Sequence, residues 1–186
     1  MKQRPVMLAA LFAICTSIAE GHAENTSFYT DIGMDKCVEE KTAPINPVHT
    51  GTWNCAGYEN IRVQLMEMDL RILVSYQFGA ESTPENGQTI PRFNTLESGH
   101  LEWRLDVNNR PIATILRFKT DDDSVLVVTK IGGPAQSCQV GLVSAKSVAN
   151  ANEIARKVAD EVAPGFRCGK DRARDYNASS VNSRSE

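Results

Sequence analysis

Hydrophobic and polar residues alternate with a period of two along several segments of this chain. Residues 61–66, IRVQLM, place three aliphatic side chains on one side of an extended backbone and polar ones on the other, which predicts a half-buried strand. Residues 70–78, LRILVSYQF, are rich in β-branched and aromatic residues and predict a second strand, paired with the first as a hairpin. The same reasoning predicts four more strands, at residues 100–107, 111–118, 125–131 and 138–145.

The only long segment with helical periodicity is ANEIARKVADEVA, residues 151–163. Its apolar residues form one stripe at helical spacing. Asn150, with Glu153 three residues later, predicts a capping box, and Pro164-Gly165 ends the helix. The pattern predicts an α+β domain: a mostly antiparallel sheet of five to seven strands with one C-terminal helix packed on it.

Both ends of the chain differ from this middle part. Residues 1–23 combine a short basic start, an apolar run and a cleavage site with small residues, which predicts a secretory signal peptide. We therefore expect a single α+β domain over residues 24–168. Residues 169–186 have almost no apolar content and predict a disordered tail.

Four cysteines remain after removal of this signal, and an even number in an exported chain indicates two disulfides. Three pairings are possible. We favour Cys37–Cys55 and Cys138–Cys168 because each closes a local loop. A zinc site is the alternative, but no CxxC spacing is present. We expect no metal site and no cofactor.

The composition limits the classes of partner. The chain carries a formal net charge of −3, which gives no electrostatic footprint for nucleic acid. The apolar run near the N-terminus is too short to span a bilayer, so we expect no membrane insertion once the signal is removed. The sequence therefore predicts a periplasmic or secreted protein, with an unknown protein as its possible partner.

The strand GHLEWRLDV, residues 99–107, carries the most suggestive polar residues. Its alternation places His100, Glu102, Arg104 and Asp106 on one face. One interpretation is a solvated sheet face on which opposite charges compensate each other, and it is the one we favour. The functional interpretation is a charged surface for docking, because an exposed row of charges suits recognition and supplies no activated nucleophile. We assign no catalytic residue.

A long polar segment, residues 79–99, precedes this strand. Loops of this length are uncommon inside a compact domain and are often functional. It contains three apolar residues, Ile90, Phe93 and Leu96, which could insert into the cleft of a partner. The simpler interpretation is a plain surface loop.

Two other functions remain open. A hydrolase could use carboxylates such as Glu102 and Asp106 as its acid and base, since paired carboxylates come together only in the fold. A copper-binding protein could use the thioethers of Met66 and Met68, completed by Met34 or His49. Methionine at the end of a strand is more often core filling.

At EWRLD, RPIATILRF and NANEIARKVADEVAPGFRCG, the chain resembles a group of small exported bacterial proteins of unknown function. The resemblance covers about residues 28–170. It implies a periplasmic location and a domain that includes the C-terminal helix and Cys168, and it implies no activity, cofactor or site. The sequence therefore favours a binding module without catalytic activity, which engages an envelope or host protein through the 79–99 loop and the adjoining strand.

Overall fold

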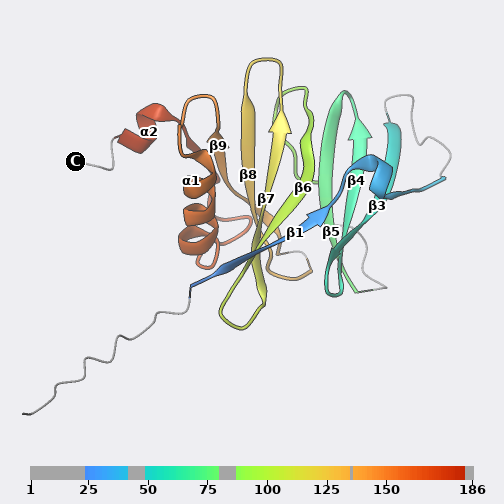
Figure 1. Ribbon diagram of the computed structural model, residues 1–186, viewed down its shortest axis with the longest axis horizontal. Helices are drawn as coiled ribbons and strands as arrows, with labels where there is room; N and C mark the ends of the chain where they lie inside the picture. The colour runs from blue at the N-terminus through green and yellow to red at the C-terminus, as the bar shows by residue number, and fades with distance from the viewer. Residues whose placement is uncertain (1–23, 42–48, 80–86, 135, 183–186) are drawn as a thin grey trace, which may run out of the picture.

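The computed structural model describes residues 24–41, 49–79, 87–134 and 136–182. The predicted signal peptide and residues 80–86 of the predicted loop lie outside these described residues. Within them the chain forms two sheets and a helical layer that is stacked on one of them (Figure 1). The predicted α+β class, with mostly antiparallel strands and a C-terminal helix, is confirmed.

The larger sheet, sheet A, has six strands in the order β1-β6-β7-β8-β9-β10. Consecutive neighbours are antiparallel, except that β10 runs parallel to β9. Its strands are β1 (Thr26–Asp31), β6 (Thr95–Leu105), β7 (Pro111–Lys119), β8 (Ser124–Lys130), β9 (Cys138–Ser144) and β10 (Arg174–Tyr176).

The smaller sheet, sheet B, has four antiparallel strands in chain order. They are β2 (Val38–Glu39), β3 (His49–Tyr58), β4 (Ile61–Met68) and β5 (Arg71–Phe78), and a short 3₁₀ turn, η1 (Met34–Lys36), precedes them. The predicted hairpin between β4 and β5 is confirmed. Asp69 and Leu70 turn the chain there with positive φ angles, which suit the twist of a two-residue hairpin.

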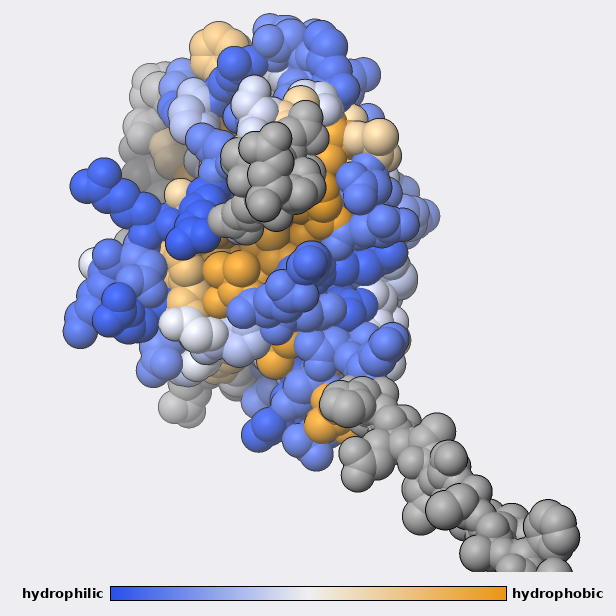
Figure 2. Space-filling model, turned by 90° about the vertical axis from the view of Figure 1, so that its left-hand side faces the viewer, coloured by the Kyte–Doolittle hydropathy of each residue, from blue (hydrophilic) through white to orange (hydrophobic). Residues whose placement is uncertain are grey.

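Sheet A separates two hydrophobic cores. The first lies between the sheets and includes Trp103, Tyr76 and Phe118. The second lies between sheet A and the helical layer, which consists of α1 (Ala151–Lys157) continued by one π-helical turn, η2 (Val158–Val162). Figure 2 shows the side of the molecule on which this layer lies, with a band of apolar atoms among polar ones. Ile154 and Val162 are only partly buried in the second core, so this layer leaves apolar surface accessible.

Two local predictions at the C-terminal end are wrong. Asn150 precedes the helix, but its side chain makes no capping hydrogen bond. The segment expected to be a disordered tail adds β10 to sheet A and then forms α2 (Ala178–Asn182). Tyr176 buries its ring against the second core, which fixes this segment although its overall composition is polar.

Both disulfides have the predicted pairing. Cys37–Cys55 joins the segment before β2 to β3, and Cys138–Cys168 joins the start of β9 to the chain after the helical layer. The first bond therefore holds the entry to the edge strand of sheet B, and the second fastens the chain after the helical layer to sheet A.

Candidate functional site

One face of strand β6 lines the core between the sheets and the other faces the helical layer, and this position determines the role of each of its alternating side chains. Leu101, Trp103 and Leu105 point into the core between the sheets. Glu102 and Arg104 point the other way, toward the helical layer, and they are only 8 % and 7 % exposed. The prediction of an open charged row is therefore wrong for these two residues, because the helical layer covers them.

Glu102 is held by three hydrogen bonds. Its carboxylate accepts one from Ser27 Oγ of β1 at 2.5 Å, and two from Nε and Nη2 of Arg156 at 2.7 and 3.3 Å. The hydrogen bond with Glu102 raises the pKa of Arg156 above its ordinary value. Arg156 also donates to the hydroxyl of Tyr29, so β1, β6 and α1 meet at this carboxylate.

Arg104 makes the corresponding contact one turn further along the helical layer. Its Nε and Nη2 donate to the two carboxylate oxygens of Asp160 at 2.9 and 2.6 Å. Its Nη1 donates to Ser27 Oγ at 2.6 Å, and Nη2 also donates to the carbonyl of Asn25. Ser27 thus connects the two ion pairs, and this network fastens the first strand and the helical layer to β6.

Asp106 lies beyond the end of β6, in the turn to β7, and is separate from this network. It accepts hydrogen bonds from the backbone N–H of Asn108 and from both the backbone and the side chain of Arg110. These bonds, with that from the Arg110 side chain the strongest, lower the pKa of Asp106 to about 2. A carboxyl group held ionised in this way suits a turn and opposes the role of proton donor.

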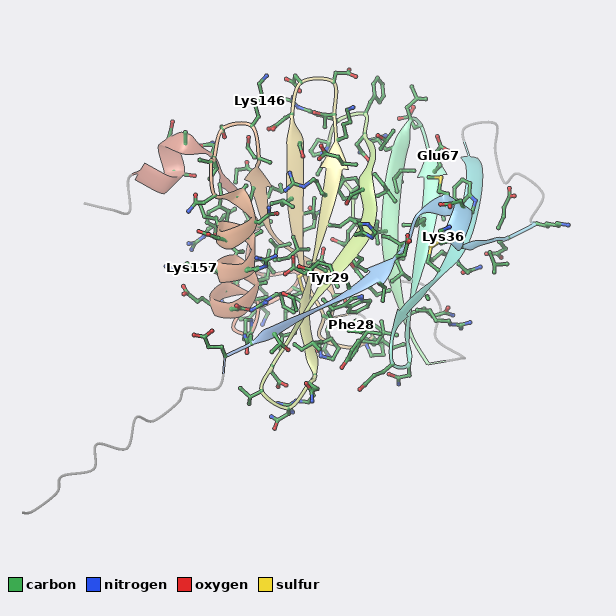
Figure 3. All side chains as sticks on the ribbon, in the orientation of Figure 1. Phe28, Tyr29, Lys36, Glu67, Lys146 and Lys157 are labelled. Atoms are coloured by element: carbon green, nitrogen blue, oxygen red, sulfur yellow. A yellow bond between two sulfur atoms is a disulfide. The ribbon has the colours of Figure 1, made fainter. Side chains whose placement is uncertain are left out.

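His100 is the one member of the predicted row with an exposed side chain and no hydrogen-bond partner among the described residues. It lines a trough of about 530 Å³ on the helix side of sheet A, together with Tyr29, Arg117 and Arg156. Figure 3 shows Tyr29 and Phe28 on β1, where this strand crosses in front of its neighbours. The four residues of the predicted row therefore have three different environments.

Phe93 belongs to a different part of the surface, at the end of the two sheets where β4 turns into β5 and β7 turns into β8. It lines an open pocket of about 570 Å³ with Pro91, Arg92 and the residues of the two turns. The backbone N–H of Asn94 donates to the carbonyl of Leu70, which brings Leu70 to the same end. Leu70 is 65 % and Phe93 57 % exposed. We call this region, residues 69–71, 91–93 and 120–122, the hairpin end.

The described part of the predicted 79–99 loop is attached to both sheets. Gln88 forms a two-way backbone bridge with Val74 of β5, and its side chain accepts a hydrogen bond from the backbone of Gln139 in β9. Ile90 is buried in the core between the sheets, and Leu96, already within β6, packs partly against the same core. Of the three apolar residues considered as possible contacts with a partner, only Phe93 is exposed.

Sequence reasoning missed the partners of these residues. Arg156 and Asp160 are four positions apart in the helix, so they share one of its sides, and this spacing was the available signal. The exposure of Leu70 could not be predicted from the sequence, because a large apolar residue next to a strand normally belongs to the core.

The methionines proposed as copper ligands are divided between two places. Met34 packs against the core between the sheets. Met66 alternates with the buried Leu65 along β4 and so points to the other side of sheet B, and the backbone of Met68 is paired with that of His49. Among the described residues there is no group of three or more His, Cys, Asp or Glu side chains that could hold a metal ion.

None of the helices in the described part of the chain has the length and apolar content needed to cross a membrane. Comparison of the chain with protein-family models, with curated proteins and with solved structures found no significant match to any of them.

Proposed function

We propose that this protein is an exported, periplasmic binding module without catalytic activity, and that a protein of the cell envelope docks on its hairpin end. The proposal rests on one observation: two large apolar side chains, Leu70 and Phe93, are each more than half exposed on neighbouring segments. Protein interfaces typically have such apolar anchors at their centre, within a rim of polar residues.

The charged residues around Leu70 and Phe93 indicate the chemical character of the complementary surface on the partner. Arg71 forms an ion pair with Asp69 at 2.6 Å, and Arg92 forms one with Asp122 at 2.5 Å. Asp121 lines the same pocket and has no hydrogen-bond or ion-pair partner among the described residues. The complementary partner surface is therefore an apolar side chain next to a lysine or arginine.

The two disulfides support the export part of this proposal. Disulfides persist in oxidising compartments such as the periplasm and are rare in the cytosol. The signal-like pattern of residues 1–23 supports the same location.

Site-specific photocrosslinking in the periplasm of the producing cell tests the docking surface. A photoreactive phenylalanine analogue replaces Phe93 or Leu70, and mass spectrometry identifies the captured protein. Val107 is the matched control position, because it is 58 % exposed but follows β6 at its other end. The proposal expects one protein captured from Phe93 and Leu70 and not from Val107.

The identified partner is then purified, and its affinity is measured by calorimetry. We expect Phe93→Ala to weaken binding about tenfold or more, as truncation of an anchor residue does. Asp121→Lys is expected to weaken it further, whereas Val107→Ala leaves it unchanged. Equal capture from all three positions, or an affinity that Phe93→Ala does not change, would overturn the proposal.

A further inference from the structure

We propose that the trough between α1 and β6 is a second, separate binding site, which takes a small organic molecule that carries a carboxylate or phosphate group. Arg117 and His100 are the residues that recognise this oxyanion. The site is independent of the hairpin end and of any protein partner.

The walls and floor of the trough have the mixed character of a ligand site. Ile115 and Leu126, both buried, form an apolar floor, and Tyr29 of β1 and Asn152 of α1 also line the trough. Its volume of about 530 Å³ falls within the range typical of small-molecule pockets, in which a few polar groups orient the ligand above apolar surface.

The backbone of β6 is irregular at this trough. Leu96 pairs with Phe118 and Leu101 with Leu116, so that four residues of β6, 97–100, lie opposite Arg117 alone. Gly99 adopts a positive φ of 52° within this bulge, and its carbonyl accepts a hydrogen bond from the N–H of Ile32. Bulges of this kind redirect side chains and are frequent next to functional sites. Here the bulge brings His100 to the lining of the trough.

Arg117 is held in place by neutral groups. Its Nη1 donates to Ser124 Oγ and its Nη2 to Asn152 Oδ1, both at 2.9 Å. The carboxylate of Glu97 lies 3.8 Å from its Nε, which is too long for a hydrogen bond. Arg156, in contrast, is engaged by Glu102 at 2.7 Å. Among the described residues, Arg117 therefore keeps N–H donors that no hydrogen bond uses, and its ion pair with Glu97 is a long one.

The N–H donors and the positive charge of Arg117 favour an oxyanion as the ligand. A guanidinium presents its donors in a planar fork that fits a carboxylate or a phosphate. The unpartnered imidazole of His100 supplies one more donor from the neighbouring strand. The floor of Ile115 and Leu126, with the ring of Tyr29, provides apolar contact for the body of an organic ligand.

Nuclear magnetic resonance titrations of the full chain with three sugars test the proposal. The probes are glucuronate, glucose 6-phosphate and neutral glucose. We expect at least one charged sugar to shift the resonances of His100 and Arg117 in a saturable manner, and glucose to leave them unchanged. Saturation by glucuronate alone identifies an organic acid as the ligand class, and saturation by glucose 6-phosphate alone identifies a phosphate ester.

Variants show whether the response comes from the proposed residues. Arg117→Gln is expected to weaken binding about tenfold or more, and Arg117→Lys, which keeps the charge but loses the fork, to restore part of it. His100→Gln breaks no side-chain hydrogen bond within the described part of the chain, so its loss of affinity reports on the ligand alone. Arg172→Gln, at an exposed arginine, is the matched control and leaves binding unchanged. The proposal is wrong if glucose binds as well as the charged sugars, if none of the three saturates, or if Arg117→Gln binds like the wild type.

Discussion

Arg104 of β6 and Asp160 of the helical layer form a bidentate ion pair, with N···O distances of 2.9 and 2.6 Å, between sheet A and the helical layer. The Arg104 side chain is only 8 % exposed and that of Asp160 27 %. A charge at such a position is costly unless it is paired and hydrogen-bonded. The pair therefore positions the helical layer against sheet A.

The first prediction concerns this pair. Asp160→Ala leaves the buried guanidinium of Arg104 without its counterion, and we expect the free energy of unfolding to fall by about 3 kcal/mol. The double change Arg104→Leu with Asp160→Ala removes both charges and is expected to recover part of this loss. Urea denaturation measures both values.

The exposed pair Lys157–Glu161 is the control for this experiment, because both of its side chains are more than 60 % exposed. Glu161→Ala is expected to cause no measurable change, because ion pairs at the surface contribute little. A loss equal to that of Asp160→Ala would show that burial of Arg104 is not the cause.

The second prediction concerns the close packing of β9. A Cβ atom added at Gly141 would lie 2.9 Å from Cγ1 of Val158 and 3.1 Å from Cε2 of Tyr176. We expect Gly141→Ala to destabilise the protein by about 1–3 kcal/mol, the usual range for overpacking. Gly165→Ala is the control, because an added Cβ there meets no atom of the described residues within 4 Å. Its melting temperature is expected to equal or exceed that of the wild type.

The third prediction concerns the disulfide after the helical layer. Cys138–Cys168 closes a loop with a sequence separation of 30. Chain entropy predicts that its removal by Cys138→Ala with Cys168→Ala costs roughly 3–4 kcal/mol. Urea denaturation measures the free energy of unfolding of this double variant and of the wild type with its disulfides oxidised. Unchanged stability would mean that the contacts of Phe166 and Tyr176 with the second core hold this segment without the bond.

The hydrophobic pattern predicted most strands and the helix correctly, because burial on one face imposes a visible period on the sequence. β4 illustrates this: Ile61, Val63 and Leu65 are buried, as their alternation requires. For β6 the same rule identified which residues share a face but not what covers that face. Only the position of the helix, fixed by the contacts of Arg156 and Asp160, shows that Glu102 and Arg104 are buried.

The C-terminal segment was mispredicted for a related reason. Residues 174–176 carry only one large apolar side chain, so their composition is that of a disordered tail. The parallel pairing with β9 and the burial of Tyr176 are long-range contacts that local composition does not encode.

The fourth prediction concerns pH. The pKa of Asp106 is lowered from 3.8 to about 2 in the folded protein, first of all by the hydrogen bond from the Arg110 side chain. As the pH falls, the Asp106 carboxylate therefore takes up a proton at a higher pH in the unfolded chain than in the folded one. The stabilisation that the ionised Asp106 gives to the fold is complete above pH 4 and is lost as the pH falls toward 2.

Asp106→Asn removes this titration and should reduce the loss of stability between these pH values. Urea denaturation of both proteins along a pH series measures the difference. An identical acid dependence of the variant and the wild type would contradict the assignment of the lowered pKa to Asp106.

The last prediction separates a structural role of Glu102 from a catalytic one. Glu102→Gln preserves the shape of the side chain but removes the charge that Arg156 contacts, and it directs an amide group toward Arg156 or toward Ser27. Hydrogen bonds to charged groups contribute about 1.5–3 kcal/mol, so we expect the free energy of unfolding to fall by this amount. A general acid or base in a hydrolase behaves differently, because its amide variant loses turnover while the fold keeps its stability. A Glu102→Gln protein as stable as the wild type would therefore argue against a structural role of the hydrogen bonds from Ser27 and Arg156 to Glu102 and would favour the hydrolase alternative.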